Sequence, residues 1–547
     1  MTYLLPQLLD RAAERDSGRD GYRVPKRGLS YGELFARANR LAHALRADGV
    51  RRGDRVGIFM PRDLESAVAV YGILRAGAAF VPIDPHAPAA ALAQIIEDCG
   101  LRHLISHRQQ LKTLRALASK GETGLHGVHG LHGLQSVFGL EAPPERPIDG
   151  LSFYPWQSLE AFPADRAPDV FMMEDDLAYL MYSSGSTGRP KGIMHTHRSG
   201  LAYARLSAET YDVQPSDRIG NHSPLHFDMS TFGYFTSPYA GATTVLIPEA
   251  HTKLAASLSK LIEDERLTIW YSVPLALIQL LTRGAIEKRD LSSLRWVLFG
   301  GEPFSRQHLH ALMRQWPNAR FSNVYGPAEV NQCTYYHVPP PAEDADDAAP
   351  VPIGREWANT EGLVLDSDDQ LTPIGEAGEL VVRSPTMMAG YWARPDLDVS
   401  AFYRQLVGGG FERIFYRTGD LVVRHENGEM VFLGRQDRQV KVRGYRLELD
   451  EIERTAMAHD AVEEAGVVPV ASGSDASGSR EIQGLYAAFT VKPDAGPVDA
   501  AELRAFLAER ISHYAVPQKI ERVDAFPRTS SGKIDRRRLR ELAEAMG

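Results

Sequence analysis

A short loop rich in serine, threonine and glycine offers the clearest chemistry in the sequence. It follows an apolar run at 177–182 and leads to Lys191. Its members are Ser183, Ser184, Gly185, Ser186, Thr187 and Gly188. Glycines let backbone N–H groups approach a ligand closely, hydroxyls donate hydrogen bonds, and Lys191 adds a positive charge. The loop is therefore predicted to bind a polyphosphate, although its spacing is not that of a Walker A loop and ligand-free Ser/Gly turns are common.

Alternating helices and short apolar strands would hold such a loop in place. Apolar residues recur at helical spacing over 31–47, and a second helix is expected over 64–75. Strands are expected over 55–60, 79–83 and 177–182. Helix and strand alternating at this spacing predict an α/β fold.

One segment breaks this alternation. Residues 121–169 are rich in Gly and Pro and show little periodicity, so a surface insertion is expected there. His126, His129 and His132 are spaced closely enough to share a metal ion, but no acidic or cysteine partner completes a ligand set. A loop with solvated imidazoles is the favoured interpretation.

The bulk composition limits the class of protein. The chain has 547 residues, a net charge of -9 and 44% hydrophobic residues, which predicts several packed cores and argues against nucleic acid or an anionic membrane as a partner. Its 2 cysteines, Cys99 and Cys333, lie far apart and fit a reducing compartment. We find neither a signal-peptide core nor a membrane-spanning run, so a cytoplasmic protein is expected.

Further segments support a family assignment. Residues 416–421 have the sequence Tyr-Arg-Thr-Gly-Asp-Leu, and 531–536 have the sequence Ser-Gly-Lys-Ile-Asp-Arg. The other matching segments are 74–84, 180–192, 226–230, 323–329 and 434–444. In this order they resemble the motifs of the adenylate-forming superfamily, which includes acyl-CoA synthetases, luciferases and nonribosomal peptide synthetase adenylation domains.

The resemblance implies an architecture. A large N-terminal AMP-binding domain, residues 1–436, would hold two α/β sheet subdomains and a β-barrel-like part. Residues 437–547 would form a small, mobile α+β lid domain. In this family the small domain turns about a hinge residue between two half-reactions, and Asp437 is the matching position.

The first half-reaction would be attack of a carboxylate on the α-phosphorus of ATP, with Mg²⁺ as cofactor. The resemblance implies that Thr187 and its loop hold the phosphates and that Glu329 binds Mg²⁺ through oxygen. Other expected nucleotide-binding residues are Lys191, Gly301, Glu302, Pro303, Asn323, Tyr325, Gly326, Asp420 and Arg435. Among these, Asn323 would bind the adenine amine, Tyr325 would stack on the ring, and Asp420 would accept hydrogen bonds from the ribose.

Lys533 is the expected catalytic cation. It would bridge the attacking carboxylate and the α-phosphate in the transition state. Without the resemblance, a lysine so near the end of the chain is more often a solvated one. The family usually carries Thr or Ser before its metal-binding glutamate, whereas this chain has Ala328, so the polar network around Glu329 must differ.

The acyl pocket is predicted by Asp228. A buried carboxylate is costly unless it meets a cation, and a substrate ammonium would supply one, although an internal His or Arg partner is the alternative. The family's pocket positions fall on Asp228, Met229, Phe232, Tyr271, Leu298, Gly300, Val324, Gln332, Cys333 and Lys533. This small, mostly apolar set resembles that of stand-alone L-proline-adenylating enzymes, which load a carrier protein on the route to pyrrole groups. Gln332 and Gly300 depart from that pattern, so alanine, valine or another compact amino acid stays open.

The second half-reaction would pass the acyl group to a thiol. Gly444 would keep a narrow pantetheine channel open, because a side chain there would obstruct it. The chain ends soon after the lysine motif, so a peptidyl carrier protein with phosphopantetheine is expected in trans, with coenzyme A as the alternative acceptor. The competing hypotheses are an acyl- or aryl-CoA synthetase, against which Asp228 argues, and a catalytically silent scaffold on the same fold.

Overall fold

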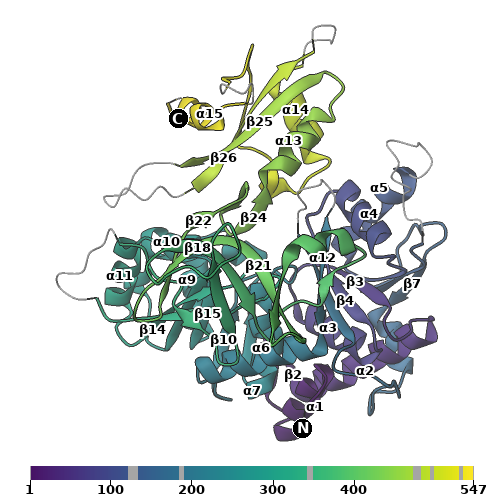
Figure 1. Ribbon diagram of the computed structural model, residues 1–547. Helices are drawn as coiled ribbons and strands as arrows, with labels where there is room; N and C mark the ends of the chain where they lie inside the picture. Colours follow the sequence, from purple (N-terminus) through teal and green to yellow (C-terminus); the bar gives the residue numbers. More distant parts are fainter. Residues whose placement is uncertain are drawn as a thin grey trace.

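The computed structural model describes residues 2–120, 133–183, 190–341, 349–471, 482–492, 498–528 and 534–545 (Figure 1). The described strands of the large unit form sheets of nine, eight and five strands. The C-terminal part of the chain forms a smaller unit that lies over one side of the large one, at the top of Figure 1.

The eight-stranded sheet carries helices on both faces. Its strands, in spatial order, are β19 (Gly390–Tyr391), β9 (Lys191–Thr196), β8 (Leu177–Ser183), β4 (Ala79–Pro82), β3 (Arg55–Phe59), β5 (His103–Ser106), β6 (Ser136–Leu140) and β7 (Ser152–Pro155). Helices α1 (Pro6–Arg15), α2 (Tyr31–Ala47) and α3 (Leu64–Arg75) cover one face, and α4 (Ala89–Asp98) and α5 (Leu111–Lys120) cover the other. Val56 and Ile58 point to the first core and Ala79 and Val81 to the second, as expected for strands buried on both faces.

The nine-stranded sheet is built in the same way. Its order is β16 (Arg355–Glu356), β15 (Thr334–Val338), β14 (Arg320–Tyr325), β13 (Trp296–Gly300), β12 (Ile269–Ser272), β10 (Arg218–Asn221), β11 (Thr243–Leu246), β1 (Asp20–Val24) and β2 (Arg27–Ser30). One face packs on α9 (Ala255–Asp264), α10 (Pro274–Arg283) and α11 (Arg306–Gln315), and the other on α6 (His197–Thr210). Val297 and Phe299 of β13 face the first core, whereas Trp296 and Leu298 face the second.

The third sheet of the large unit is open. It runs β17 (Glu361–Leu365), β18 (Ala377–Arg383), β21 (Phe411–Arg424) and β20 (Phe402–Val407), with β22 (Met430–Arg435) paired to β21. Short helix α12 (Pro395–Ala401) precedes β20. Within the described residues, no pairing closes this sheet into a barrel, so the expected barrel-like part is an open sheet.

The small unit begins with a hairpin that reaches the large unit (Figure 1). Strands β23 (Gln439–Val442) and β24 (Tyr445–Glu448) form the hairpin, and α13 (Leu449–Met457) follows it. The remaining elements are β25 (Val462–Ala471), β26 (Ile482–Val491), α14 (Ala500–Ala508), the 3₁₀ turn η6 (His513–Ala515), β27 (Lys519–Arg522) and α15 (Arg536–Ala545). Their apolar side chains form cores separate from those of the large unit.

The structure confirms most of the expected elements and corrects one. Helices α2 and α3 and strands β3, β4 and β8 lie where the pattern predicts them. A surface insertion over 121–169 is wrong for its second part, because β6 and β7 extend the eight-stranded sheet and Val137 and Phe138 are fully buried. Strands of four or five residues, flanked by Gly and Pro, leave too short an apolar run to detect. His126, His129 and His132 lie outside the described residues.

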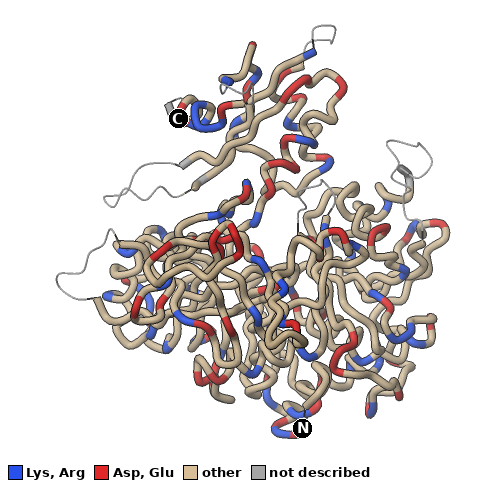
Figure 2. The backbone as a smooth tube through the Cα atoms, in the orientation of Figure 1, with Lys and Arg blue, Asp and Glu red and all other residues tan. Residues whose placement is uncertain are grey.

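The surface agrees with the mild net charge. Figure 2 shows acidic and basic residues interspersed over both units, with a basic run on α15. None of the helices in the described part of the chain is long and apolar enough to cross a membrane.

Candidate active site

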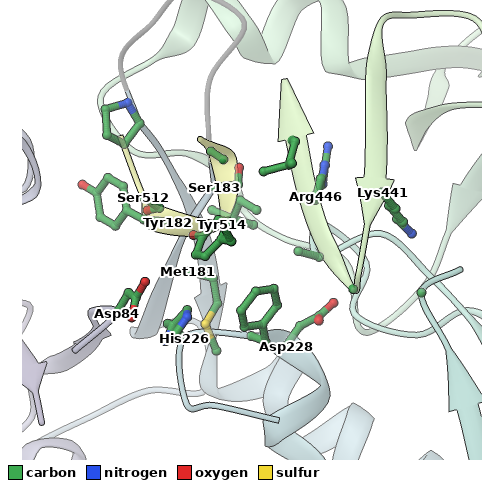
Figure 3. A pocket seen from close by; sticks show the side chains of 18 of the residues that line it. Asp84, Met181, Tyr182, Ser183, His226, Asp228, Lys441, Arg446, Ser512 and Tyr514 are labelled. Atoms are coloured by element: carbon green, nitrogen blue, oxygen red, sulfur yellow. The ribbon is translucent and has the colours of Figure 1, made fainter. Parts of the chain in front are cut away.

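A cavity of about 210 Å³ lies where the hairpin of the small unit meets the large unit (Figure 3). Its walls come from residues at or just beyond the ends of strands: Asp84 after β4, Ser183 at the end of β8, Val273 after β12 and Gly301 after β13. Open α/β sheets bind ligands outside the carboxyl ends of their strands. The parallel strands of both sheets therefore present their ligand-binding ends to one cavity.

The predicted phosphate loop falls between β8 and β9 in the sequence, and its described flanking residues Ser183 and Pro190 line this cavity. Ser184, Gly185, Ser186, Thr187 and Gly188 lie outside the described residues. Ser183 lines the cavity, and its buried hydroxyl has no hydrogen-bond partner within the described residues. Lys191 follows at the start of β9, with its Nζ 3.8 Å from Glu329 Oε1. A hydroxyl at the carboxyl end of β8 that has no partner among the described residues, with a lysine at the start of the adjacent β9, fits the phosphates of a nucleotide.

Glu329 is the electrostatic centre of the site. It is 0% exposed, and both of its oxygens have partners. Oε1 accepts a hydrogen bond of 2.8 Å from the Tyr391 hydroxyl, and Oε2 accepts one of 2.7 Å from Arg446 Nη1. Burial raises the pKa of Glu329, but Arg446 and Lys191 outweigh it, so the pKa lies well below its usual range. Glu329 is therefore an ionised carboxylate in the protein interior.

A carboxylate of this kind fits Mg²⁺. Oxygen ligands suit the ion, and Mg²⁺ in nucleotide sites is held by one or two carboxylates together with substrate phosphates. The described residues contain no group of three or more His, Cys, Asp or Glu side chains that could hold a metal alone. Nucleotide oxygens would have to complete the coordination of an ion on Glu329.

The expected nucleotide residues are only partly gathered at the cavity. Gly301, Gly326, Asp420 and Arg435 line it. Asp420 accepts hydrogen bonds from the Tyr325 hydroxyl at 2.5 Å and from Arg435 Nη1. Asn323, Glu302 and Pro303 do not line the cavity. The Asn323 amide donates a 2.8 Å hydrogen bond to the Pro352 carbonyl, and the Glu302 carboxylate accepts one from the Gly444 amide. Pro303 is exposed.

The expected acyl pocket separates into two layers. Asp228, Met229, Tyr271 and Val324 line the cavity. The remaining predicted positions do not line it but pack behind or beside these residues: Phe232, Leu298, Gly300, Gln332 and Cys333. Asp228 Oδ1 accepts a 2.8 Å hydrogen bond from the Met229 amide. Its carboxylate lies deep in the protein at the cavity wall, and this burial raises its pKa to about 6.

The two positions that depart from the proline pattern have structural partners. A Cβ on Gly300 would lie 2.1 Å from the Val324 carbonyl oxygen, so the register of β13 against β14 requires glycine there. Gln332 Nε2 donates a 2.8 Å hydrogen bond to the Tyr211 hydroxyl, away from the cavity. Neither residue contacts the space next to Asp228, so neither departure argues against a small substrate.

The hairpin of the small unit contributes two cations that we did not assign from the sequence. Lys441 and Arg446 are opposite each other across β23 and β24, and both line the cavity (Figure 3). Arg443 and Gly444 form the connecting turn, with φ of 55° and 84°, as a tight hairpin requires. A Cβ on Gly444 would lie 2.8 Å from Val273 Cγ1, so glycine also permits the close approach to the large unit. A two-residue turn between Lys441 and Arg446 is a sequence signal that could have revealed them, because it pairs the two residues directly across a hairpin and so puts both side chains on one face.

The expected hinge lies between the two units. Arg435, in the last strand of the large unit, makes two hydrogen bonds of 2.7 Å to Asp437, whose side chain is 49% exposed. Lys533 lies outside the described residues. Its described neighbour Arg536 pairs with Glu453 of α13 at 2.8 Å, and Figure 1 places α15 on the side of the small unit away from the cavity.

Comparisons with known proteins agree with this geometry. The AMP-binding enzyme family model matches residues 9–392, and the model of the AMP-binding enzyme C-terminal domain matches residues 451–533. An L-proline–[L-prolyl-carrier protein] ligase of Pseudomonas fluorescens is 32% identical over 516 residues, 94% of each chain. A ligase of the same name from Streptomyces coelicolor is 35% identical over 515 residues, 93% of this chain and 91% of the relative.

A solved structure gives the same result for the fold. The amide bond synthetase McbA from Marinactinospora thermotolerans superimposes with a TM-score of 0.82 over 99% of both chains, at 23% identity. The assignment made from the sequence motifs is thus confirmed. The chain belongs to the AMP-binding enzyme family, whose members are adenylate-forming enzymes.

Proposed function

We propose that this protein converts L-proline to prolyl-AMP with ATP, and then transfers the prolyl group to the phosphopantetheine thiol of a separate carrier protein. The observation that carries the proposal is Asp228 at the wall of a small cavity whose other acyl-side members are Met229, Tyr271 and Val324. An acid among such side chains suits a compact substrate with an ammonium group. The names of the two ligase relatives support proline and a carrier protein.

The first half-reaction joins two anions. A carboxylate oxygen of the amino acid attacks the α-phosphorus, and the bond to pyrophosphate breaks. Thr187 and Lys191 would hold the phosphates, and Lys533 would lie between the carboxylate and the α-phosphate, where negative charge develops. Glu329 would hold Mg²⁺, which when bound neutralises phosphate charge. Tyr325, Asp420 and Arg435 would hold the nucleoside, in keeping with the hydrogen bonds that already join them.

For the second half-reaction, the small unit would have to present a different face to the cavity. The thiol sulfur attacks the acyl carbonyl carbon, AMP leaves, and the thiol proton is released. We place the boundary at 436/437 with Asp437 as hinge, because β22 ends the large unit's last sheet at Arg435 and β23 starts at Gln439. In the described arrangement Gly444 lies against Val273, and α15 lies on the side of the small unit away from the cavity. This arrangement suits thiol transfer. A rotation about Asp437 would bring Lys533 to the cavity for the first half-reaction.

ATP–pyrophosphate exchange with a panel of acids tests the substrate. Proline, alanine, valine, a medium-chain fatty acid and benzoate would be compared at equal concentration. We expect proline to give the highest exchange and the acids without an amine to give none, because Asp228 would lack its cation. One methylene in an apolar pocket changes discrimination by only about 10- to 200-fold, so weak exchange with valine is compatible. Exchange with benzoate or the fatty acid above that of every amino acid would contradict the proposal.

Replacing Lys533 by alanine tests the catalytic cation. The change should lower the exchange rate by about 10²- to 10³-fold, as is typical for a lost electrostatic stabiliser. Transfer of the prolyl group from synthetic prolyl-AMP to the carrier should be nearly unchanged, since Lys533 would serve only the first half-reaction. Lys519→Ala, at an exposed lysine of the same unit, is the matched control. Equal exchange rates for Lys533→Ala and the control would remove Lys533 from the mechanism.

The raised pKa of Asp228 gives a pH test. Its folded-state pKa is about 6 and its ordinary value 3.8, so the folded protein keeps this proton more tightly than the unfolded chain does. The contribution of protonated Asp228 to the free energy of unfolding is fully present below pH 3.8 and is lost as pH rises through 6. Asp228→Asn should therefore gain stability over the substrate-free wild type as pH rises from 4 to 6, reaching on the order of 1–2 kcal/mol.

Thermal unfolding midpoints of both proteins, measured across this pH range, check the prediction. Asp165→Asn, at an exposed acid, is the control. Added proline should reduce the difference between the unfolding midpoints of Asp228→Asn and the wild type at pH 7, because proline should stabilise the wild type alone. A difference that does not vary with pH would mean that Asp228 already has a cationic partner.

A further inference from the structure

Arg446 binds the carboxylate that we propose as the metal ligand. Its Nη1 lies 2.7 Å from Glu329 Oε2. The arginine comes from β24 of the small unit (Figure 3), whereas the glutamate belongs to the large unit. Glu329 is 0% exposed and the Arg446 side chain 15% exposed, so the pair is screened little by water. It is the most enclosed ion pair that we find between the described parts of the two units.

Arg446 and a metal ion on Glu329 would compete for the same carboxylate. Tyr391 and Lys191 approach Oε1, and Arg446 occupies Oε2. A Mg²⁺ ion would sit about 2.1 Å from a carboxylate oxygen. It would then lie within a few ångströms of the guanidinium, where two positive charges repel strongly in a site with little water.

The contact of Arg446 with Glu329 has an electrostatic value of its own. It adds a positive charge and a hydrogen bond to a fully buried carboxylate, for which partners are needed. Lys191 stays within 3.8 Å but is a residue of the large unit, so it does not change when the small unit turns. Docking of the small unit therefore adds the charge of Arg446 to the charge that Lys191 already supplies.

We propose that Arg446 replaces the divalent cation on Glu329 when the hairpin docks, so that metal binding and docking of the small unit exclude each other. Arg446 is then a positioning residue. It would hold the hairpin at Glu329 while that carboxylate carries no metal, and the charge of a metal on the same carboxylate would oppose this contact. The inference rests on the proposed function only for Glu329 as metal ligand. It does not depend on which acid is activated or which thiol accepts it.

Arg446 can be tested without dismantling the interface. The Gly444 amide still donates to Glu302, and Tyr445 contacts Phe227 with ring centroids 5.5 Å apart. The core of the small unit is formed by other residues. An Arg446→Gln protein should thus fold and retain its hinge motion.

Fluorescence energy transfer between the units gives the direct measurement. Dyes would be attached through Ser158→Cys and Glu541→Cys, both at exposed positions, because the native Cys99 and Cys333 are buried. Mg²⁺ would be titrated at a fixed concentration of α,β-methylene-ATP, which cannot transfer its AMP. We expect the transfer efficiency of the wild type to change with Mg²⁺, and the midpoint to fall about tenfold in Arg446→Gln, since the competing cation is gone. Mn²⁺ affinity, read by electron paramagnetic resonance, should rise by a similar factor.

The controls separate this inference from the proposed function. Arg443→Gln, in the same turn but exposed, should keep the wild-type midpoint, and Glu329→Gln should abolish the response to Mg²⁺. Equal midpoints and Mn²⁺ affinities in Arg446→Gln and Arg443→Gln would overturn the inference, as would a wild-type signal that ignores Mg²⁺. The experiment contains no amino acid and no thiol. Failure of the exchange panel would therefore overturn the proposed function while leaving this result to stand or fall independently.

Discussion

The site is organised by the need of Glu329 for positive charge. An ionised carboxylate in the interior is tolerated only where cations and hydrogen-bond donors surround it. Lys191 of β9, Tyr391 of β19 and Arg446 of β24 meet this need from three separate parts of the chain. Two of these elements belong to the eight-stranded sheet and the third to the small unit, so one charge ties together the two units.

The architecture brings this charge close to the acyl pocket. The parallel strands of both sheets direct their carboxyl ends toward one cavity, and apolar cores pack on both faces of each sheet. Asp228 thus lines the same 210 Å³ cavity as Arg446 and Lys441. It comes from the connection between β10 and β11 of the nine-stranded sheet, whereas the two cations come from the hairpin of the small unit. The site separates its acids by function: Asp228 faces apolar side chains and has a raised pKa, whereas Glu329 faces cations and has a lowered pKa.

Much of the framework could be predicted from sequence because its signals are local. Helix α2 follows its apolar periodicity and begins with a capping box of Ser30 and Glu33. Strands β6 and β7 were missed because pairing of β6 with β5 and of β7 with β6, rather than any local pattern, makes them strands. The motif resemblance identified the family and the acids Glu329 and Asp420. It could not reveal that Arg446 reaches Glu329, since that contact joins residues 117 positions apart across two units. Thr187 and Lys533 stay predictions, because they lie outside the described residues.

The central claim is that Glu329 exchanges one cation for another as the small unit moves. A crystal structure with Mn²⁺ and α,β-methylene-ATP tests it most directly, because anomalous scattering locates the metal. The account predicts metal density bonded to a Glu329 oxygen, with the Arg446 guanidinium moved beyond hydrogen-bond reach of that carboxylate. A structure in which Mn²⁺ and Arg446 both contact Glu329, or in which the metal binds elsewhere while Arg446 stays in place, would contradict it.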